Sequence, residues 1–209
     1  MTTERRSWLK QALIWPLGLA AVGLIGLSAC SQKPAKFNSM DVTDAPWGQR
    51  YSLPDLQGKI TTQASFPGKV TAVFFGFMYC PDACPTHLTK MAEVKKLLGK
   101  NADKLQLVFI TIDPERDTAE QLTKYLASFD PAIVGLRGSL DETEAITKDF
   151  RVFYKKVDTK DSRRDPKAYT IDHTTFTYVY DGQGKLRLVI PHDLAVEKIA
   201  SDIHNLIAR

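Results

Sequence analysis

Two cysteines separated by three residues are the part of this sequence best suited to chemistry. Cys80 and Cys84 occur in the segment Cys-Pro-Asp-Ala-Cys-Pro, directly after the apolar run 73–78. Two thiols at the end of a buried strand can share a soft metal ion or close into a disulfide. His173 lies far downstream, just before a second strand-like run, and offers a third ligand. Two thiolates and one imidazole form a ligand set that suits Cu(I).

The spacing of the cysteines argues against two common kinds of site. Thioredoxin-type redox sites use Cys-x-x-Cys, and structural zinc sites need four ligands, usually as two such pairs. Neither pattern occurs among the 3 cysteines of the chain. Pro85 predicts a helix that begins there with Cys84 as its N-cap, because proline is tolerated in the first helical turn. The helix dipole would then favour a thiolate at Cys84, with Cys80 in the preceding loop.

The elements that must position these residues alternate along the chain. Hydrophobic periodicity and turn residues predict a hairpin of strands 51–53 and 60–62, strand 70–77, helix 85–98, strand 105–112, helix 118–129, helix 141–150, strand 152–157, a hairpin of strands 176–180 and 186–190, and a last helix capped by Asp193. Strand, helix, strand, helix is typical of a parallel α/β sheet. Residues 155–167 carry six basic and three acidic side chains, and we expect a solvated loop with positive excess there.

The N-terminal segment predicts export. Basic residues precede an uncharged, mostly apolar run from Ala12 to Ala29, which ends in Leu-Ser-Ala before Cys30. This pattern is typical of a lipoprotein signal peptide, residues 1–29, with Cys30 lipidated as the mature N-terminus. The alternative is an uncleaved transmembrane anchor, because the run approaches the ~20 residues that span a bilayer. Either way, the polar stretch 30–46 would tether a domain of residues 47–209 to a membrane.

Charge argues against a nucleic-acid-binding protein. The whole chain has a formal net charge of +4, and loss of Glu4, Arg5, Arg6 and Lys10 with residues 1–29 would leave +2. A nearly balanced domain has no strong basic field, and the usual nucleic-acid-binding motifs do not occur.

Several segments together resemble the Sco/SenC/PrrC family, and they follow the expected order along nearly all of the mature region. They are Gly58-Lys59, Phe74-Phe75-Gly76, the segment 80–85, Thr111-Ile-Asp-Pro-Glu-Arg-Asp-Thr118, Ile171-Asp-His173 and Asp181-Gly-Gln-Gly184. The resemblance implies an α/β protein of thioredoxin-like fold, with a central mixed sheet flanked by helices and an N-terminal β-hairpin. The sequence departs from the family at Phe77-Met-Tyr79, where Tyr-Thr is more usual before the first cysteine, and we expect this to alter packing rather than ligation.

The resemblance also implies a function. Family members deliver copper to the dinuclear site of cytochrome c oxidase subunit II, and the family's copper ligands match Cys80, Cys84 and His173. The expectation is therefore a membrane-tethered copper chaperone, facing the periplasm or another extracytoplasmic space, with subunit II or its assembly factors as partner. The alternative is a thiol-disulfide reductase, in which Cys80 and Cys84 act as the redox pair and His173 handles protons or is structural.

Other residues near the motifs compete for roles. His87 could approach a metal from the same helix face as Cys84, although an ordinary surface histidine is the simpler interpretation. Asp82 could orient the thiols or form a turn. Charges in Asp113–Asp117 are expected to be structural, with an internal pair to Arg116, and His192 and His204 are expected to be surface groups.

Overall fold

A six-stranded mixed sheet forms the centre of the computed structural model, which describes residues 36–165 and 167–208. In spatial order its strands are β1 (Met40–Asp41), β10 (Leu186–Ile190), β9 (Thr177–Tyr180), β4 (Val70–Gly76), β5 (Leu105–Thr111) and β6 (Val134–Leu136). Strands β4, β5 and β6 run parallel, and β9, β10 and β1 are added antiparallel. This arrangement confirms the predicted α/β class with a central mixed sheet, and the N-terminal hairpin of β2 (Ser52–Pro54) and β3 (Ile60–Thr62) is also present.

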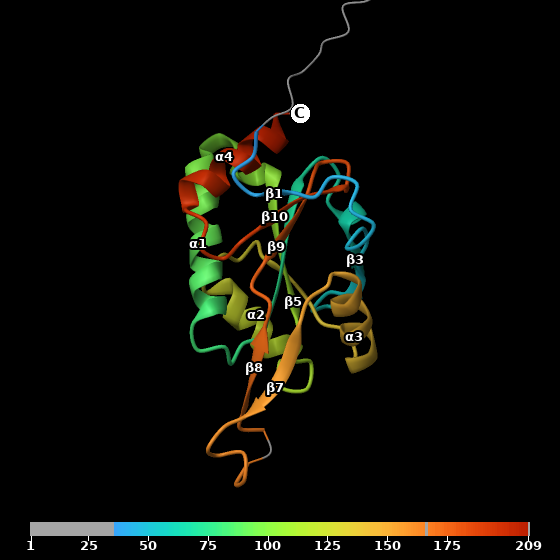
Figure 1. Ribbon diagram of the computed structural model, residues 1–209, viewed down its shortest axis with the longest axis vertical. Coiled ribbons are helices and arrows are strands. Elements are labelled where there is room, and N and C mark those ends of the chain that lie inside the picture. Colours follow the sequence, from blue (N-terminus) through green and yellow to red (C-terminus); the bar gives the residue numbers. More distant parts are fainter. Residues whose placement is uncertain (1–35, 166, 209) are drawn as a thin grey trace, which may run out of the picture. The chain divides into compact units, whose positions relative to one another are not determined.

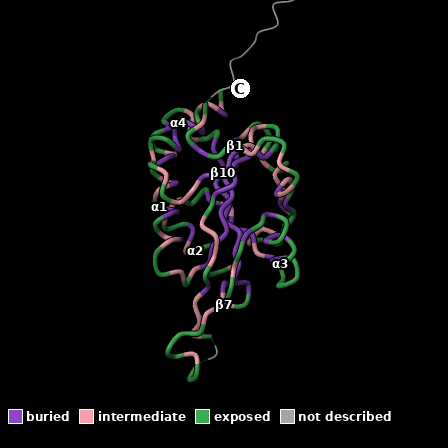
Figure 2. The backbone as a smooth tube through the Cα atoms, in the orientation of Figure 1, coloured by how far each residue is buried: buried purple, intermediate pink, exposed green. Residues whose placement is uncertain are grey.

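Strands β4 and β5 are the buried centre of the sheet because helices cover both of its faces. Every residue of both strands is buried, as their continuous apolar sequences predict for parallel strands with two covered faces. Figure 2 shows this buried core running through the middle of the domain. Because β4 and β5 are parallel, their carboxyl ends lie at the same end of the sheet. The loops that follow them can therefore bring side chains together into a site.

Helices lie on the two sides of the sheet. In Figure 1, α1 (Ala83–Leu98), α2 (Ala119–Ala127) and α4 (Val196–Ile207) lie on one side, and α3 (Leu140–Asp149) on the other. Two short 3-10 helices, η1 (Gln63–Ser65) and η2 (Gly99–Lys104), complete the elements. Among the described residues, no helix has the length and apolar character needed to span a bilayer.

Two predicted helix starts differ from the structure. Helix α1 begins at Ala83 with Asp82 as its N-cap, so Cys84 and Pro85 lie inside the first turn. Proline fits there because the first four N–H groups of a helix have no intrahelical acceptor. Helix α4 begins after Ala195, and no side chain caps it, so the predicted cap at Asp193 is wrong.

The predicted basic loop 155–167 is wrong at its N-terminal end, because residues 155–158 belong to the first strand of a β-hairpin, which overlaps the predicted strand 152–157. Strand β7 (Tyr154–Asp158) pairs antiparallel with β8 (Tyr169–His173), and the loop between them is shorter than the charge pattern suggested. Lysines do not prevent pairing here because their side chains point to solvent while Ile171 is buried and Val157 is half-buried. Figure 1 shows the hairpin projecting beyond the end of the sheet, and we call residues 154–173 the hairpin arm.

The N-terminal part of the described chain is held against the sheet and α4. The buried carboxylate of Asp202 accepts hydrogen bonds from the backbone N–H groups of Asn38 and Ser39, and β1 pairs with β10. Residues 38–46 therefore lie within the folded domain, although their composition predicted a tether up to residue 46. The predicted signal peptide 1–29 and Cys30 lie outside the described residues.

Candidate metal centre

The two cysteines lie where β4 ends and α1 begins. Gly76 is the last residue of β4, and a Cβ atom added there would lie 2.7 Å from Cys84 Sγ. Glycine thus leaves the space that the sulfur of Cys84 occupies. Cys84 is fully buried, Cys80 is half-buried in the preceding loop, and both thiols are free. The backbone N–H of Cys84 donates to Cys80 Sγ at 3.4 Å, so the sulfur of Cys80 accepts a bond from the first turn of α1.

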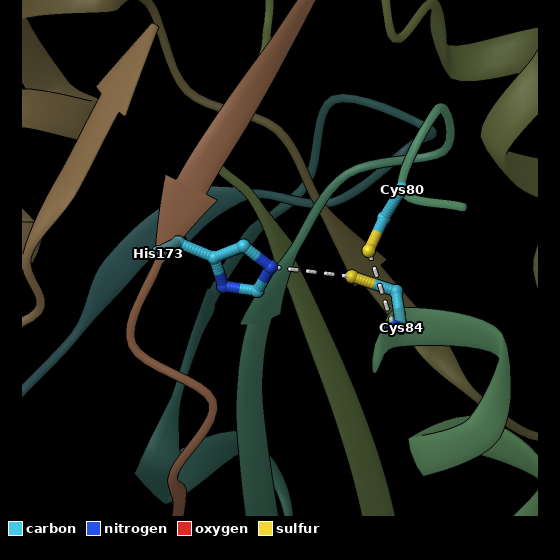
Figure 3. A group of neighbouring side chains, drawn as sticks. All are labelled: Cys80, Cys84 and His173. Atoms are coloured by element: carbon cyan, nitrogen blue, oxygen red, sulfur yellow. Dashed lines mark hydrogen bonds between the residues drawn. The ribbon is translucent and has the colours of Figure 1, made fainter. Parts of the chain in front are cut away.

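His173 reaches the thiols from the end of β8, far away in sequence. Its Nε2 lies 3.6 Å from Cys84 Sγ, as Figure 3 shows. Its Nδ1 lies 2.9 Å from the carbonyl oxygen of Thr174 and can donate to it, which leaves the lone pair of Nε2 facing the sulfurs. The rings of Phe77 and Phe74 lie edge-on beside the imidazole, with centre distances of 5.7 and 6.3 Å. One ligand atom from each of Cys80, Cys84 and His173 lies within 4.8 Å of the others.

The thiolate belongs on Cys80 and not on Cys84, which corrects the assignment predicted from the helix dipole. A hydrogen bond from the Cys84 side chain is the main cause that lowers the pKa of Cys80, to about 3. Hydrogen bonds from the backbone N–H groups of Asp82 and Cys84 lower this pKa further. The same bond and its complete burial raise the pKa of Cys84. The hydrogen bond between the two side chains, together with the burial of Cys84, therefore outweighs the dipole, and the more exposed sulfur carries the negative charge.

Asp117 supports the loop that carries the cysteines. Its carboxylate accepts from the backbone N–H of Met78 at 3.2 Å and from the hydroxyl of Thr111 at 2.6 Å. Burial raises the pKa of Asp117 to about 6, and the Thr111 and Met78 bonds oppose this shift. The segment after β5 thus holds the segment after β4, two residues before Cys80.

Arg116 joins three segments around the site. Its Nε donates to buried Asp113 Oδ2 at 2.5 Å, and its Nη1 donates to the carbonyl oxygens of Lys167 and Tyr169, at 3.0 and 2.6 Å. The guanidinium also lies 3.6 Å from the ring centre of Tyr169 and 4.8 Å from that of Tyr79. It therefore fastens the hairpin arm, which ends in His173, to the loop that follows β5.

The structure brings together the three predicted ligands and separates the other candidates from them. His87 is buried and stacks on Phe74, so the interpretation as a surface group is wrong, and it is not part of the group of three. Asp82 is exposed at the N-cap of α1. The predicted pair between Arg116 and Asp113 is confirmed.

Tyr169 and the supporting role of Asp117 were not foreseen. The hydroxyl of Tyr169 donates to Asp113 Oδ1 at 2.7 Å. A signal was present, because Asp-Pro-Glu-Arg-Asp follows a predicted strand at the edge where binding residues gather.

A mixed-sheet α/β domain with two thiols after β4 and an imidazole from a distant hairpin defines a thioredoxin-like protein with a Cys-Cys-His metal centre. The SCO1/SenC family model matches residues 40–208, and the chain belongs to this family. An SCO2-like protein of Rickettsia felis is 41% identical over 138 residues, which are 66% of this chain and 66% of that protein. This chain thus spans just under two thirds of that relative.

Solved structures of the family share the fold. The structure of Bradyrhizobium japonicum ScoI with copper bound is 40% identical, with a TM-score of 0.66, and the match covers 75% of this chain and 97% of that one. A second solved structure is that of BsSco, a member of the Sco family of cytochrome c oxidase assembly proteins in which a disulfide switch was identified. It is 22% identical, with a TM-score of 0.58, and the match covers 83% of this chain and 98% of that one. At this identity the likeness shows the fold alone.

Proposed function

We propose that this protein binds copper through Cys80, Cys84 and His173 and takes part in the assembly of cytochrome c oxidase. One observation carries the proposal: two sulfurs and an imidazole nitrogen from separate parts of the chain lie within 4.8 Å of one another. Soft thiolates and an imidazole select Cu(I) over hard cations. The copper-bound ScoI structure, at 40% identity, supports the choice of metal.

The residues around the site fit a bound copper ion. Metal-bound histidines usually donate their second ring N–H to an acceptor, which fixes the free nitrogen toward the metal, and the carbonyl of Thr174 fills this role for His173. Cys80 is already disposed to be a thiolate, and copper would supply the charge that draws the proton from Cys84. The rings of Phe74 and Phe77 shield the imidazole from water.

Copper is the cargo in this proposal, and its receiver is the dinuclear copper site of oxidase subunit II. Cys80 is half-buried whereas Cys84 is fully buried, so a ligand of the receiving protein can approach from the Cys80 side. Three ligands leave an open position, through which the receiver's thiolate could bind before the donor sulfurs leave.

The test compares His173→Ala with His204→Ala, which removes an exposed histidine of α4. Anaerobic Cu(I) titration of the reduced full-length chain should show weaker binding for His173→Ala and unchanged binding for His204→Ala. Because imidazole forms no bond in a disulfide, both variants should still cycle between dithiol and disulfide. Full Cu(I) affinity in His173→Ala would overturn the ligand assignment. Normal oxidase assembly in cells carrying His173→Ala would favour the second function below.

The low pKa of Cys80 supports a second candidate, a thiol-disulfide reductase. The Cys80 thiolate would attack a disulfide of the oxidase or another exported protein, form a mixed disulfide and release one thiolate of that substrate. Cys84, after loss of its proton, would displace the other substrate sulfur and close a Cys80–Cys84 disulfide, so two electrons pass to the substrate. Trapping would test this step: Cys84→Ser should accumulate the mixed disulfide, and Cys80→Ser should not.

We further propose that a lipid on Cys30 tethers the domain to a membrane on its extracytoplasmic side. The support is the sequence Leu-Ser-Ala-Cys after an apolar run with basic residues before it. Cys30→Ala should leave an unprocessed precursor that takes up no labelled fatty acid, whereas wild type should be processed and labelled. Lipid incorporation by the variant, or none by wild type, would contradict this proposal.

A further inference from the structure

A second pair of metal-binding side chains lies close to the thiol site. His87 of α1 is 3% exposed and stacks on Phe74, with ring centres 4.0 Å apart. His192, in the segment between β10 and α4, places its ring centre 6.2 Å from that of His87, with the ring planes tilted by 34°. Phe74 also contacts His173, so this histidine pair lies one aromatic ring away from the proposed copper ligands.

Both histidines have a shielded nitrogen without a partner. The Nδ1 atoms of His87 and His192 are shielded from solvent, and neither atom forms a hydrogen bond with another described residue. Buried polar atoms in folded proteins are nearly always paired, because an unpaired one costs about 1–3 kcal/mol. Two such atoms on neighbouring imidazoles are available as ligands for a bound group.

The chemistry of His87 favours a metal ion as the occupant. Burial lowers its pKa to about 3, so the ring is neutral and has one N–H and one lone pair. Its Nε2 lies 3.0 Å from the hydroxyl of Thr177, and donation to that oxygen leaves the lone pair on Nδ1. A hydroxyl or carbonyl acceptor behind the imidazole is the arrangement that most metal-bound histidines show.

The distance between the rings and the nearby charge limit which ion fits. Two metal–nitrogen bonds of about 2 Å each, in line, span ~4 Å, so the 6.2 Å separation of the ring centres leaves room for one ion between a nitrogen of each ring. Lys90 donates to the carbonyl oxygens of His192 and Leu194, so its positive charge lies beside the pair. A neutral two-nitrogen site next to a lysine disfavours a divalent ion more than a monovalent one.

We propose that His87 and His192 form a second, weaker binding site for monovalent copper, with one nitrogen from each ring as ligand. The site would hold Cu(I) one aromatic ring away from the thiols, where an ion can be held before or after it occupies them. This assignment is independent of the thiol site and can be tested when that site has been removed.

The experiment uses a full-length chain in which all three cysteines and His173 are replaced: Cys30→Ala, Cys80→Ser, Cys84→Ser and His173→Ala. Anaerobic titration with Cu(I), in competition with a chromogenic chelator, should show one equivalent bound. His192→Ala in this background should abolish the binding, whereas His204→Ala, which removes an exposed histidine elsewhere, should leave it unchanged. Thr177→Val, which removes the acceptor behind His87, should weaken it about 10–100-fold.

A spectroscopic measurement keeps the test decisive even if a variant folds poorly. In the same background, with His87, His192 and His204 intact, addition of Ag(I) as a stable monovalent probe should shift one ¹⁵N side-chain resonance of His87 and one of His192, and none of His204. Cu(I) uptake that survives His192→Ala, or Ag(I) shifts at other residues, would overturn the proposal. So would no uptake at all, which would indicate a bridging water between the two nitrogens.

Discussion

Replacing Arg116 by glutamine should destabilise the protein by about 3 kcal/mol, because it leaves a buried carboxylate without its counter-charge. The side chains of Arg116 and Asp113 are 7% and 0% exposed, and they form a 2.5 Å contact. Removing one partner of a buried pair costs about 3–5 kcal/mol. We expect the lower end of that range because Asp113 keeps the hydrogen bond from the Tyr169 hydroxyl.

The measurement is urea unfolding of the full-length chain, followed by far-UV circular dichroism. A loss of about 3 kcal/mol corresponds to a Tm lower by roughly 6–12 °C for a domain of this size. Lys124→Gln is the matched control, because Lys124 pairs with Glu120 on the surface, where both side chains are at least 74% exposed. An exposed pair of this kind contributes about 0.3–0.5 kcal/mol, so the control should change little.

The double variant Arg116→Gln, Asp113→Asn separates the buried charge from other losses. Without the carboxylate no charge is left uncompensated, so the double variant should be more stable than the sum of the two single effects predicts, by about 1–3 kcal/mol. Arg116→Lys should rescue little, because an ammonium cannot bond Asp113 and the two carbonyls of the hairpin arm in one plane. A single-variant loss below about 1 kcal/mol, or strictly additive effects, would refute this reasoning.

Two further predictions concern the thiols and the hairpin arm. Because the pKa of Cys80 is about 3, iodoacetamide should modify Cys80 in the reduced protein at nearly the same rate from pH 8 down to pH 5. The rate should fall progressively as the pH drops through about 3. A tenfold loss of rate per pH unit between pH 8 and pH 5 would contradict the assignment of the thiolate to Cys80. If the hairpin arm docks an acidic partner, neutralising the exposed Lys155, Arg163 and Arg164 should slow association with that partner and flatten its salt dependence, with Cu(I) affinity unchanged. The control variant neutralises lysines at the end of α1 and in η2, namely Lys96, Lys100 and Lys104; equal effects of both variants would exclude a specific role for the arm.

Much of the fold was predictable from the sequence because local patterns decide it. Continuous apolar runs became β4 and β5, and the amphipathic segments became α1, α2 and α3 within a few residues of their predicted ends. The cysteine pair was equally visible, because two residues four apart, in a loop and in the first turn of the helix that follows it, lie close without any long-range folding.

The sequence did not allow us to predict which polar side chains are buried or which separated segments come together. Strand β7 overlaps the predicted strand 152–157, but its lysines suggested a loop from residue 155, and β8 was missed because its apolar alternation is weak. His87 falls at the same helical spacing as buried Cys84, Leu88 and Met91, and this signal of burial was outweighed by its polar side chain. The preference for a thiolate on Cys80 depends on the hydrogen bond between the two side chains and on the deeper burial of Cys84, and spacing alone determines neither.

The three ligand residues come from two parts of the chain, and this distinguishes copper binding from disulfide formation. Both sulfurs come from one short segment between β4 and α1, so disulfide formation needs no contribution from the hairpin arm. The imidazole comes from the base of that arm, where His173 pairs with Tyr154, and Arg116 and Tyr169 fasten the arm to the segment after β5. A change that loosens the arm should therefore weaken a metal centre of three ligands, while leaving the thiols able to react with each other. Copper binding reports on the docked arm and thiol oxidation does not, so measuring both on one variant distinguishes a displaced His173 from a damaged cysteine loop.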